Sequence, residues 1–219
     1  MFTRRTLLAA CCAAGSAIAL GGCTGAARSP GANESPTTQG HNVSSPDGVL
    51  LAYFSRPGEN YFNGGRIDLD VGNTEVLAKL IAATVPVTTY RIEAADPYPH
   101  SYDETVARNV DEQQRNARPA IANPLPELTG YHTVLLGSPI WNVRPPMIMS
   151  TFIDGVDLAG KTVHPFVTYA VSGLGSTVAD YTTLAPRATL GQALAIRGEE
   201  AGNARDRVRA WLEQISLTA

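Results

Sequence analysis

Cysteine is missing from the chain after residue 23. The three cysteines, Cys11, Cys12 and Cys23, all belong to the N-terminal segment, so the rest of the chain forms no disulfide bond and offers no catalytic thiol. Roughly 170 residues follow this segment and the polar stretch after it, which is enough for one domain with its own hydrophobic core. Such a domain must be stable through that core alone.

Side-chain patterns typical of metal sites are missing as well. Asp68 and Asp70 begin like a calcium-binding loop, but Asn73 and Lys79 stand where that loop requires glycine and glutamate. No two histidines have the spacing of paired zinc ligands. The four histidines are His41, His100, His132 and His164. We therefore expect no metal site.

Two common enzyme motifs and a basic surface are also missing. Gly173-Leu174-Gly175 lacks the third glycine of a dinucleotide-binding fingerprint, and no serine lies in a Gly-x-Ser-x-Gly elbow. Lysine and arginine total 17 against 20 aspartates and glutamates, which argues against a nucleic-acid partner. Arg205, Arg207 and Arg209 are close in sequence, but they fit the solvated face of a terminal helix.

The N-terminus carries a targeting pattern. Arg4-Arg5 precede an apolar stretch that reaches Leu20, as in a twin-arginine signal, although general secretory signals also carry two basic residues. This stretch is too short for a comfortable membrane span, which takes about 20 residues. Leu20-Gly21-Gly22-Cys23 resembles the lipobox of bacterial lipoproteins, in which the cysteine is lipidated. The alternative is an ordinary signal peptide with an incidental cysteine.

These features divide the chain into three parts. Residues 1–23 form the predicted twin-arginine or lipoprotein-type signal peptide, residues 24–46 a flexible linker rich in Gly, Ser, Pro and Thr, and residues 47–219 the folded domain. The predicted location is the cell membrane, outside the cytoplasm, with a lipid anchor on Cys23.

Strand-like and helix-like segments alternate through the domain. The predicted strands are Val49–Phe54, Val87–Ile92, Thr133–Ser138, about 162–168 and, more weakly, about 193–196. The predicted helices open at Gly72-Asn73-Thr74, Tyr102, Pro145-Pro146, Val178 and Asn203. This alternation predicts an α/β fold, a doubly wound five-stranded parallel sheet with helices on both faces. Ligands of such sheets bind at the carboxyl ends of the strands.

The first strand and the first helix indicate a phosphate site. Ser55 ends the buried strand, and Gly72-Asn73-Thr74 opens a helix, which presents unpaired N–H groups and the positive end of its dipole. A phosphate can bind there without any lysine, with help from the Ser55 and Thr74 hydroxyls. The alternative is a capped helix after an ordinary surface loop.

The residues at these positions resemble the flavodoxin-like proteins, which bind flavin mononucleotide (FMN). The resemblance covers about residues 48 to 216 and is carried by Tyr53-Phe54-Ser55, Gly72-Asn73-Thr74, Gly137-Ser138-Pro139-Ile140-Trp141 and Gly160-Lys161 before Pro165-Phe166-Val167-Thr168. It implies a flavodoxin-like fold with FMN as cofactor. It also implies that the phosphate is held at Ser55, Gly72, Asn73 and Thr74. The loops after the third and fourth strands would flank the flavin ring, through Ser138, Pro139, Ile140, Trp141, Asn142, Thr168, Ser172, Gly173 and Gly175.

Trp141 is the most informative of these residues because its flat indole can stack on the ring. The alternative is a hydrophobic lid on the sheet edge, and we favour stacking. Asn142 stands where related sequences often carry a second aromatic residue, so the ring is clamped more loosely. His132 replaces a common acid at a position remote from the expected site.

A longer departure from the family pattern is the insertion Pro57–Val71, which interrupts the phosphate loop. It could fold over the ribityl chain of FMN or narrow access to it. Whether Arg56, Glu59 or Asn60 also touches the ligand stays open.

The resemblance implies redox electron transfer with a protein partner or a small electron acceptor. No residue then acts as an acid or base catalyst, since the cofactor supplies the chemistry. One alternative is an NAD(P)H-dependent, quinone-type FMN reductase, which the mild acidity of the domain leaves open because carriers are usually strongly acidic. Another is a flavodoxin fold without cofactor that serves as a binding module.

Overall fold

The computed structural model describes residues 48–218. The predicted signal peptide, the linker and the Cys23 lipidation site lie outside the described residues. Within those residues, no helix combines the length and the apolar character needed to cross a membrane.

The described residues alternate between strands and helices, as the sequence predicts. In chain order, the elements are β1 (Val49–Phe54), β2 (Gly58–Phe62), β3 (Gly65–Leu69), α1 (Asn73–Ala82), β4 (Thr88–Ile92), α2 (Tyr102–Gln114), β5 (Thr133–Pro139), α3 (Met147–Gly155), β6 (Thr162–Tyr169), α4 (Thr177–Leu184), β7 (Thr189–Leu190), β8 (Leu194–Arg197), the 3₁₀ helix η1 (Gly198–Asn203) and α5 (Arg205–Gln214).

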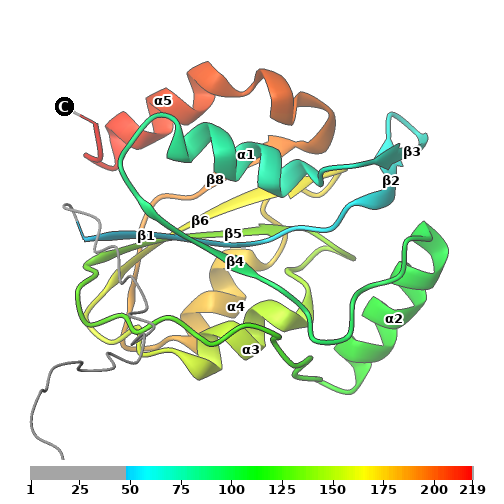
Figure 1. Cartoon of the computed structure of the whole chain (residues 1–219), viewed down its shortest axis with the longest axis horizontal. Coiled ribbons are helices and arrows are strands. Elements are labelled where there is room, and N and C mark those ends of the chain that lie inside the picture. The colour runs from blue at the N-terminus through cyan, green and yellow to red at the C-terminus, as the bar shows by residue number, and fades with distance from the viewer. Residues whose placement is uncertain (1–47, 219) are drawn as a thin grey trace, which may run out of the picture. The chain divides into compact units, whose positions relative to one another are not determined.

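The main sheet is parallel throughout and has the order β4-β1-β5-β6-β7, with β8 also paired to β6. Helices α1 and α5 cover one face and helices α3 and α4 the other (Figure 1). This order and layering are those of a flavodoxin-like doubly wound fold, which confirms the predicted fold class.

The fifth position of the sheet is shared by two short strands. Strand β7 pairs with the start of β6 and strand β8 with its end. Between them the strand is interrupted, beginning at Gly191. A Cβ on Gly191 would lie 2.2 Å from the His164 ring, so only glycine fits at this break. The sequence pattern predicts β8 as the last strand but gives no sign of β7. Helix α5 begins at Arg205 rather than at Asn203, which is the last residue of η1.

The strand alternation builds two cores, one on each face of the sheet. In β1, Leu50, Ala52 and Phe54 belong to the core under α3 and α4, whereas the side chains between them belong to the core under α1 and α5. All six β1 residues are buried, and each large side chain contributes about 1.5–3 kcal/mol. This central strand therefore fixes where its polar carboxyl end lies.

Two elements lie at the carboxyl edge of the sheet instead of on its faces. Strands β2 and β3 form a separate antiparallel hairpin, and helix α2 lies beside it (Figure 1). The hairpin occupies most of the predicted insertion Pro57–Val71. Its turn is Asn63-Gly64, and both residues have positive φ (45° and 86°), as a type I′ turn requires.

Candidate functional site

A cavity of about 430 Å³ lies at the carboxyl ends of β1, β5 and β6, within the size range of ligand pockets. Its walls come from five places: the end of β1, the start of α1, the loops after β5 and β6, the β2–β3 hairpin with helix α2, and the first residues of η1. The lining therefore combines segments that lie far apart in the chain.

The start of helix α1 forms one end of this cavity. Gly72 is the N-cap residue, so the N-cap position itself offers no side-chain acceptor. The N–H of Glu75 donates to the Gly72 carbonyl (3.0 Å) and to Ser55 Oγ (3.1 Å). Among the described residues, the N–H groups of Asn73 and Thr74 have no acceptor of this kind. Free N–H groups at a helix start attract an anion.

Gly72 allows the backbone to come close to the end of β1. A Cβ at this position would lie 2.4 Å from the Arg56 carbonyl oxygen and 2.4 Å from Ser55 Oγ. No side chain fits into that space. A glycine here keeps the helix start against the loop and leaves the cradle between them open.

Buried hydroxyl groups face each other across this end of the cavity. Thr74 Oγ1 and Thr168 Oγ1 are 2.7 Å apart, so one of them donates and the other keeps its proton for a further acceptor. Ser55 Oγ accepts from Glu75 and also keeps its proton. Together with the helix start, these groups form an uncharged set of donors suited to phosphate oxygens.

Arg56 is buried next to this set of donors, but its terminal nitrogens already donate hydrogen bonds within the protein. They donate to the carbonyl oxygens of Pro99 (2.8 Å), His100 (3.0 Å) and Glu59. Burial lowers the pKa of the guanidinium from its ordinary value. Its Nε is buried without a partner among the described residues and is a donor left over beside the cavity. Arg56 mainly fastens the hairpin to the loop before α2.

The loop after β5 is a tight turn with strained backbone. The N–H of Trp141 donates to the Arg144 carbonyl (2.9 Å), and Arg144 donates back (3.3 Å). The two residues between them, Asn142 and Val143, have φ of 50° and 62°. Asn tolerates this region, whereas a β-branched valine is rare there and costs about 1–2 kcal/mol. Strain of this kind clusters at functional sites.

The loops after β5 and β6 are bound to each other. Ser176 N–H donates to the Val143 carbonyl (2.9 Å), and a Cβ on Gly175 would lie 2.1 Å from the same oxygen. An ion pair joins Arg144 to Asp180 (3.2 Å), which also accepts from Ser176 Oγ (2.7 Å). The two loops predicted to flank a flavin ring are therefore held together by hydrogen bonds and an ion pair.

Trp141 combines the two interpretations that its sequence position allows. It lines the cavity and also makes edge contacts with Phe54 (5.7 Å between ring centroids) and Tyr98 (5.1 Å). Gln113 of α2 holds the backbone of this loop: its Nε2 donates to the Trp141 carbonyl (3.2 Å), and its Oε1 accepts from Asn142 (3.0 Å). The indole is positioned by protein contacts on more than one side.

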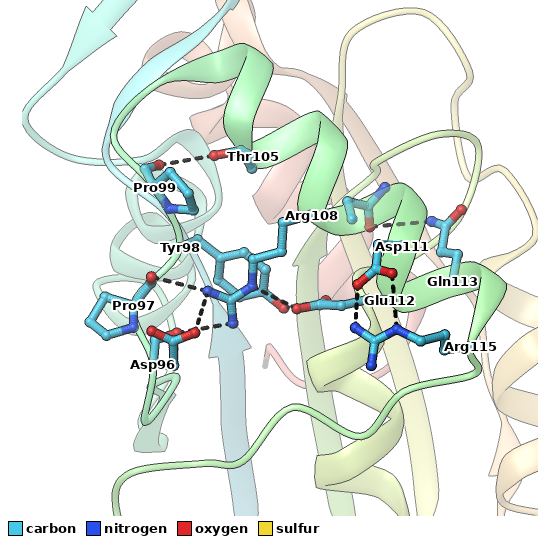
Figure 2. Close-up of polar contacts among 11 residues, drawn as sticks. Asp96, Pro97, Tyr98, Pro99, Thr105, Arg108, Asp111, Glu112, Gln113 and Arg115 are labelled. Atoms are coloured by element: carbon cyan, nitrogen blue, oxygen red, sulfur yellow. Dashed lines mark hydrogen bonds and ion pairs between the residues drawn. The ribbon is translucent and has the colours of Figure 1, made fainter.

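The contacts behind Tyr98 are polar, as Figure 2 shows. Its hydroxyl donates to Glu112 of α2 (2.8 Å), and Arg108 lies over its ring (4.1 Å) while pairing with Glu112 (2.7 Å). Arg108 also binds the backbone of Asp96 and Pro97. Burial, followed by the Glu112 charge, raises the pKa of Tyr98 strongly. This cluster fixes α2 to the loop before it, and through Tyr98 it supports Trp141.

The β2–β3 hairpin covers the cavity and is fastened at its tip. Asn60 and Tyr61 line the cavity. At the turn, Asn63 N–H donates to Glu199 Oε1 of η1 (2.9 Å). The predicted insertion is thus an ordered hairpin that forms part of the cavity wall.

The other side of the hairpin is fastened to the start of α2. Glu59 accepts from the Tyr102 N–H (3.0 Å), and Arg66 forms two hydrogen bonds with Asp103 (2.8 and 2.6 Å). The Arg66 guanidinium also lies over the Tyr102 ring (4.6 Å). The hairpin therefore bridges α2 and η1.

The structure brings nine of the thirteen predicted site residues into the lining. They are Ser55, Asn73, Thr74, Pro139, Ile140, Trp141, Asn142, Thr168 and Ser172. The other four, Gly72, Ser138, Gly173 and Gly175, lie next to lining residues and outside the lining itself. Of these, Ser138 is buried with no partner for its hydroxyl among the described residues.

The sequence pattern missed one whole wall of the cavity. We call it the α2 wall, and its residues share one face of that helix. They are Tyr102, Thr105, Val106, Asn109 and Val110. Their spacing of three and four is visible in the sequence, but nothing in it says that this face lines a cavity. Glu199 was missed too. The described residues contain no cluster of three or more potential metal ligands, and the absence of a metal site stays a prediction.

Comparison with known families supports what the fold indicates. Residues 68–215 match the family model described as flavodoxin. The chain therefore belongs to the flavodoxin family.

Solved structures give the same result. A candidate flavoprotein from Bacteroides uniformis is 30% identical, with a TM-score of 0.62 over 76% of this chain and 98% of that one. A candidate flavoprotein from Bacteroides eggerthii is 28% identical (TM-score 0.61, 78% and 98%). A flavoprotein from Lactobacillus acidophilus, solved in complex with FMN, shares the fold at 17% identity (TM-score 0.55, 74% and 99%). No curated protein matches the chain.

Proposed function

We propose that this protein binds FMN in the cavity at the carboxyl edge of its sheet and serves in redox electron transfer. The observation that carries the proposal is the open start of α1, where Asn73 and Thr74 present free N–H groups beside the Ser55 and Thr74 hydroxyls. Bound FMN would supply one- and two-electron chemistry. The similarity to a flavoprotein solved with FMN supports the choice of cofactor.

The residues of this chain would bind and orient the cofactor. Ser55, Asn73 and Thr74 would hold the phosphate, with the nearby Arg56 Nε as a further donor. Trp141 would lie against the ring, and the loop from residue 170 to residue 175 would face it. The contacts between the loops after β5 and β6 support this arrangement because they keep the two ring-flanking segments in a fixed relation.

The test is flavin binding by the purified full chain. We expect a retained FMN spectrum and binding to riboflavin, which lacks the phosphate, that is about a hundredfold weaker, since charge-assisted hydrogen bonds contribute about 1.5–3 kcal/mol each. The double variant Asn73→Ala, Thr74→Val should reduce that preference about tenfold, because it removes the Thr74 hydroxyl and the Asn73 amide while the backbone N–H groups and Ser55 Oγ remain. The matched control Thr182→Val, at an exposed position of α4, should keep it. A folded chain that binds neither flavin would favour the module without cofactor.

We also propose that the protein works outside the cytoplasm, tethered to the membrane through Cys23, with residues 24–46 as the linker. The lipobox-like Leu20-Gly21-Gly22-Cys23 supports this. Replacement of Cys23 by serine should release the protein from the membrane fraction. Replacement of Arg4 and Arg5 by lysine should block export if the route is the twin-arginine one, and continued export would assign the general secretory route.

A further inference from the structure

A buried histidine lies near the amino end of β6, at the opposite end of that strand from the cavity. His164 is the third residue of the strand and is 8% exposed. Its ring packs under Gly191, at the interruption between β7 and β8. The side chain takes no part in the cavity lining. His164 is therefore a buried titratable group that the proposed function does not use.

The carbonyl oxygen of Gln192 joins this histidine to helix α5. His164 Nδ1 lies 3.1 Å from that oxygen, and Trp211 Nε1 of α5 also donates to it (3.1 Å). Because a carbonyl oxygen only accepts, Nδ1 carries the proton of the neutral ring. The Gln192 side chain adds a contact to α5 by donating to Gln214 (2.7 Å). We call His164, Gln192 and Trp211 the Gln192 junction.

The Gln192 junction has no group that balances a charge on His164. The structure gives Nε2 no hydrogen-bond partner within residues 48–218. Burial lowers the pKa of His164, the Gln192 carbonyl opposes that shift only in part, and no charged side chain acts on it. The Trp211 ring centroid is 6.4 Å from that of His164, beyond the about 6 Å at which an aromatic face stabilises a cation.

The elements packed against His164 present uncharged groups to it. On β5 its register partner is Leu135, and the interruption between β7 and β8 presents Gly191 and Gln192. The charged residues of α5 are all exposed, and they are Arg205, Asp206, Arg207, Arg209 and Glu213. A proton on His164 therefore places a charge in a buried site without a counter-ion, which is unfavourable.

Helix α5 is also fastened to the segment that holds the hairpin. Arg207 donates to the Ala195 carbonyl of β8 (2.7 Å) and pairs with Glu200 of η1 (2.9 Å). In η1, Glu199 accepts from the Asn63 N–H at the hairpin turn (2.9 Å). A continuous set of contacts thus runs from the Gln192 junction through α5 and η1 to the hairpin.

We propose that the Gln192 junction is a pH-sensitive fastening, in which protonation of His164 loosens α5 and, through η1, releases the hairpin turn from Glu199. The folded chain binds this proton less readily than the unfolded chain. The fastening is therefore complete above the ordinary histidine pKa of about 6.5 and weakens as the pH falls below it. As a control of access to the cavity, this inference rests on the proposed function, but the fastening itself needs no bound cofactor.

Another histidine acts on the hairpin in the opposite direction. His100 Nε2 lies 3.0 Å from Asp68 of β3, so protonation of His100 strengthens its attraction to that carboxylate. Both side chains are largely exposed, and pairs of this kind contribute little. A loosening of the hairpin at low pH therefore cannot come from His100.

The test is an NMR titration of the purified full chain without flavin, from about pH 7.5 to about pH 5, where ordinary carboxylates stay charged. The His164 ring reports its own protonation, and the Trp211 indole N–H reports the bond to Gln192. Amide hydrogen exchange at Asn63, corrected for its intrinsic pH dependence, reports the contact with Glu199. We expect a His164 midpoint below about 6.5 and an indole shift with the same midpoint. Exchange at Asn63 should be about threefold or more faster at the lower pH.

Matched variants separate this effect from other titrations. His164→Asn keeps a donor for Gln192 and cannot take up a proton, so it should abolish the changes at Trp211 and Asn63. His164→Gln serves the same purpose if the asparagine variant does not fold. His132→Asn, at an exposed position before β5, should leave both changes in place.

Two results would overturn the inference. One is the same pH response in a folded, uncharged His164 variant as in the unchanged chain. The other is a response at only one of the two reporters, Trp211 and Asn63, because the proposal links them. A chain that binds no FMN would overturn the proposed function alone, since neither reporter depends on the flavin.

Discussion

Two helices, α1 and α2, begin at the same edge of the sheet, and their starts differ. At α2, Ser101 is the N-cap and accepts from Glu104 (3.4 Å), while Glu59 of the hairpin accepts from Tyr102 (3.0 Å). At α1, the N-cap is Gly72, and the first N–H groups are left for something outside the protein. Both helices carry an acidic residue in the first turn.

The difference shows how a fold reserves a place for a ligand. A helix start that only needs stability takes a side-chain cap, which contributes about 1 kcal/mol. The chain forgoes that cap at α1 and uses a glycine whose missing side chain keeps the cradle open. A helix start that keeps free N–H groups at the carboxyl edge of a parallel sheet therefore carries functional information that a fully capped one lacks.

Filling the cradle at α1 has the largest expected effect. Gly72 has φ of −67°, which alanine adopts freely, so Gly72→Ala acts only through its Cβ against Arg56 and Ser55. We expect FMN binding to weaken about a hundredfold, with a loss of about 1–3 kcal/mol in stability from overpacking. Fluorescence titration and thermal unfolding measure the two effects. Gly130→Ala, where a Cβ meets nothing within 4 Å, is the control and should change neither.

A pair of threonine substitutions compares the two starts directly. Thr74→Val removes a hydroxyl that faces Thr168 and should weaken FMN binding about tenfold and cost about 1–3 kcal/mol in stability. Thr105→Val in α2 removes hydrogen bonds to Pro99 and Ser101. It should cost similar stability and lower FMN affinity less than Thr74→Val does, because the Thr105 side chain lines the cavity but its hydroxyl is taken up by two backbone carbonyls. Equal losses of affinity would show that the two starts are equivalent.

Removal of the α2 cap has a smaller expected effect. Ser101→Ala should cost about 0.5–2 kcal/mol of unfolding free energy, measured by urea denaturation, because the Glu104 N–H loses its acceptor. The affinity for FMN should stay unchanged. A marked loss of FMN would mean that α2 positions the cofactor site as a whole.

The smallest effect is the response to inorganic phosphate. In the flavin-free chain, phosphate should shift the backbone amide resonances of Asn73 and Thr74 and leave those of Tyr102 and Glu104 unmoved, since only the first pair is free. Shifts at both helix starts would indicate a general electrostatic effect. Sulfate serves as a second anion of similar shape.

Part of this molecule can be predicted from the sequence alone. The runs Val49–Phe54 and Thr133–Ser138 are apolar on both faces, which fixes them as central parallel strands, and the strand ends then place Ser55 and the start of α1 at one edge. The start of α1 can be recognised in the sequence because the residues that signal it, Gly72-Asn73-Thr74, are adjacent in the chain. The short strands β7 and β8, which both pair with β6, are less visible because four residues or fewer form each.

The hairpin and the α2 wall show two different limits. Asn63-Gly64 is a strong local signal for a type I′ hairpin, but the flanking strands Gly58–Phe62 and Gly65–Leu69 are short and largely polar, so the segment does not stand out as a hairpin. The α2 wall has no such signal. Its two valines, Val106 and Val110, line a cavity that exists only once the hairpin, α2 and the loop after β5 are assembled, so the wall is a property of the fold rather than of any segment.

The hairpin also affects how fast a ligand binds and leaves. Because hydrogen bonds at Asn63 and Glu59 fasten it on both sides, it moves away from the cavity only when these bonds open. For a bound molecule that extends under the hairpin, such an opening step slows arrival and departure alike without changing the affinity. The time that a ligand stays bound then depends on the hairpin contacts as well as on the contacts that set its affinity.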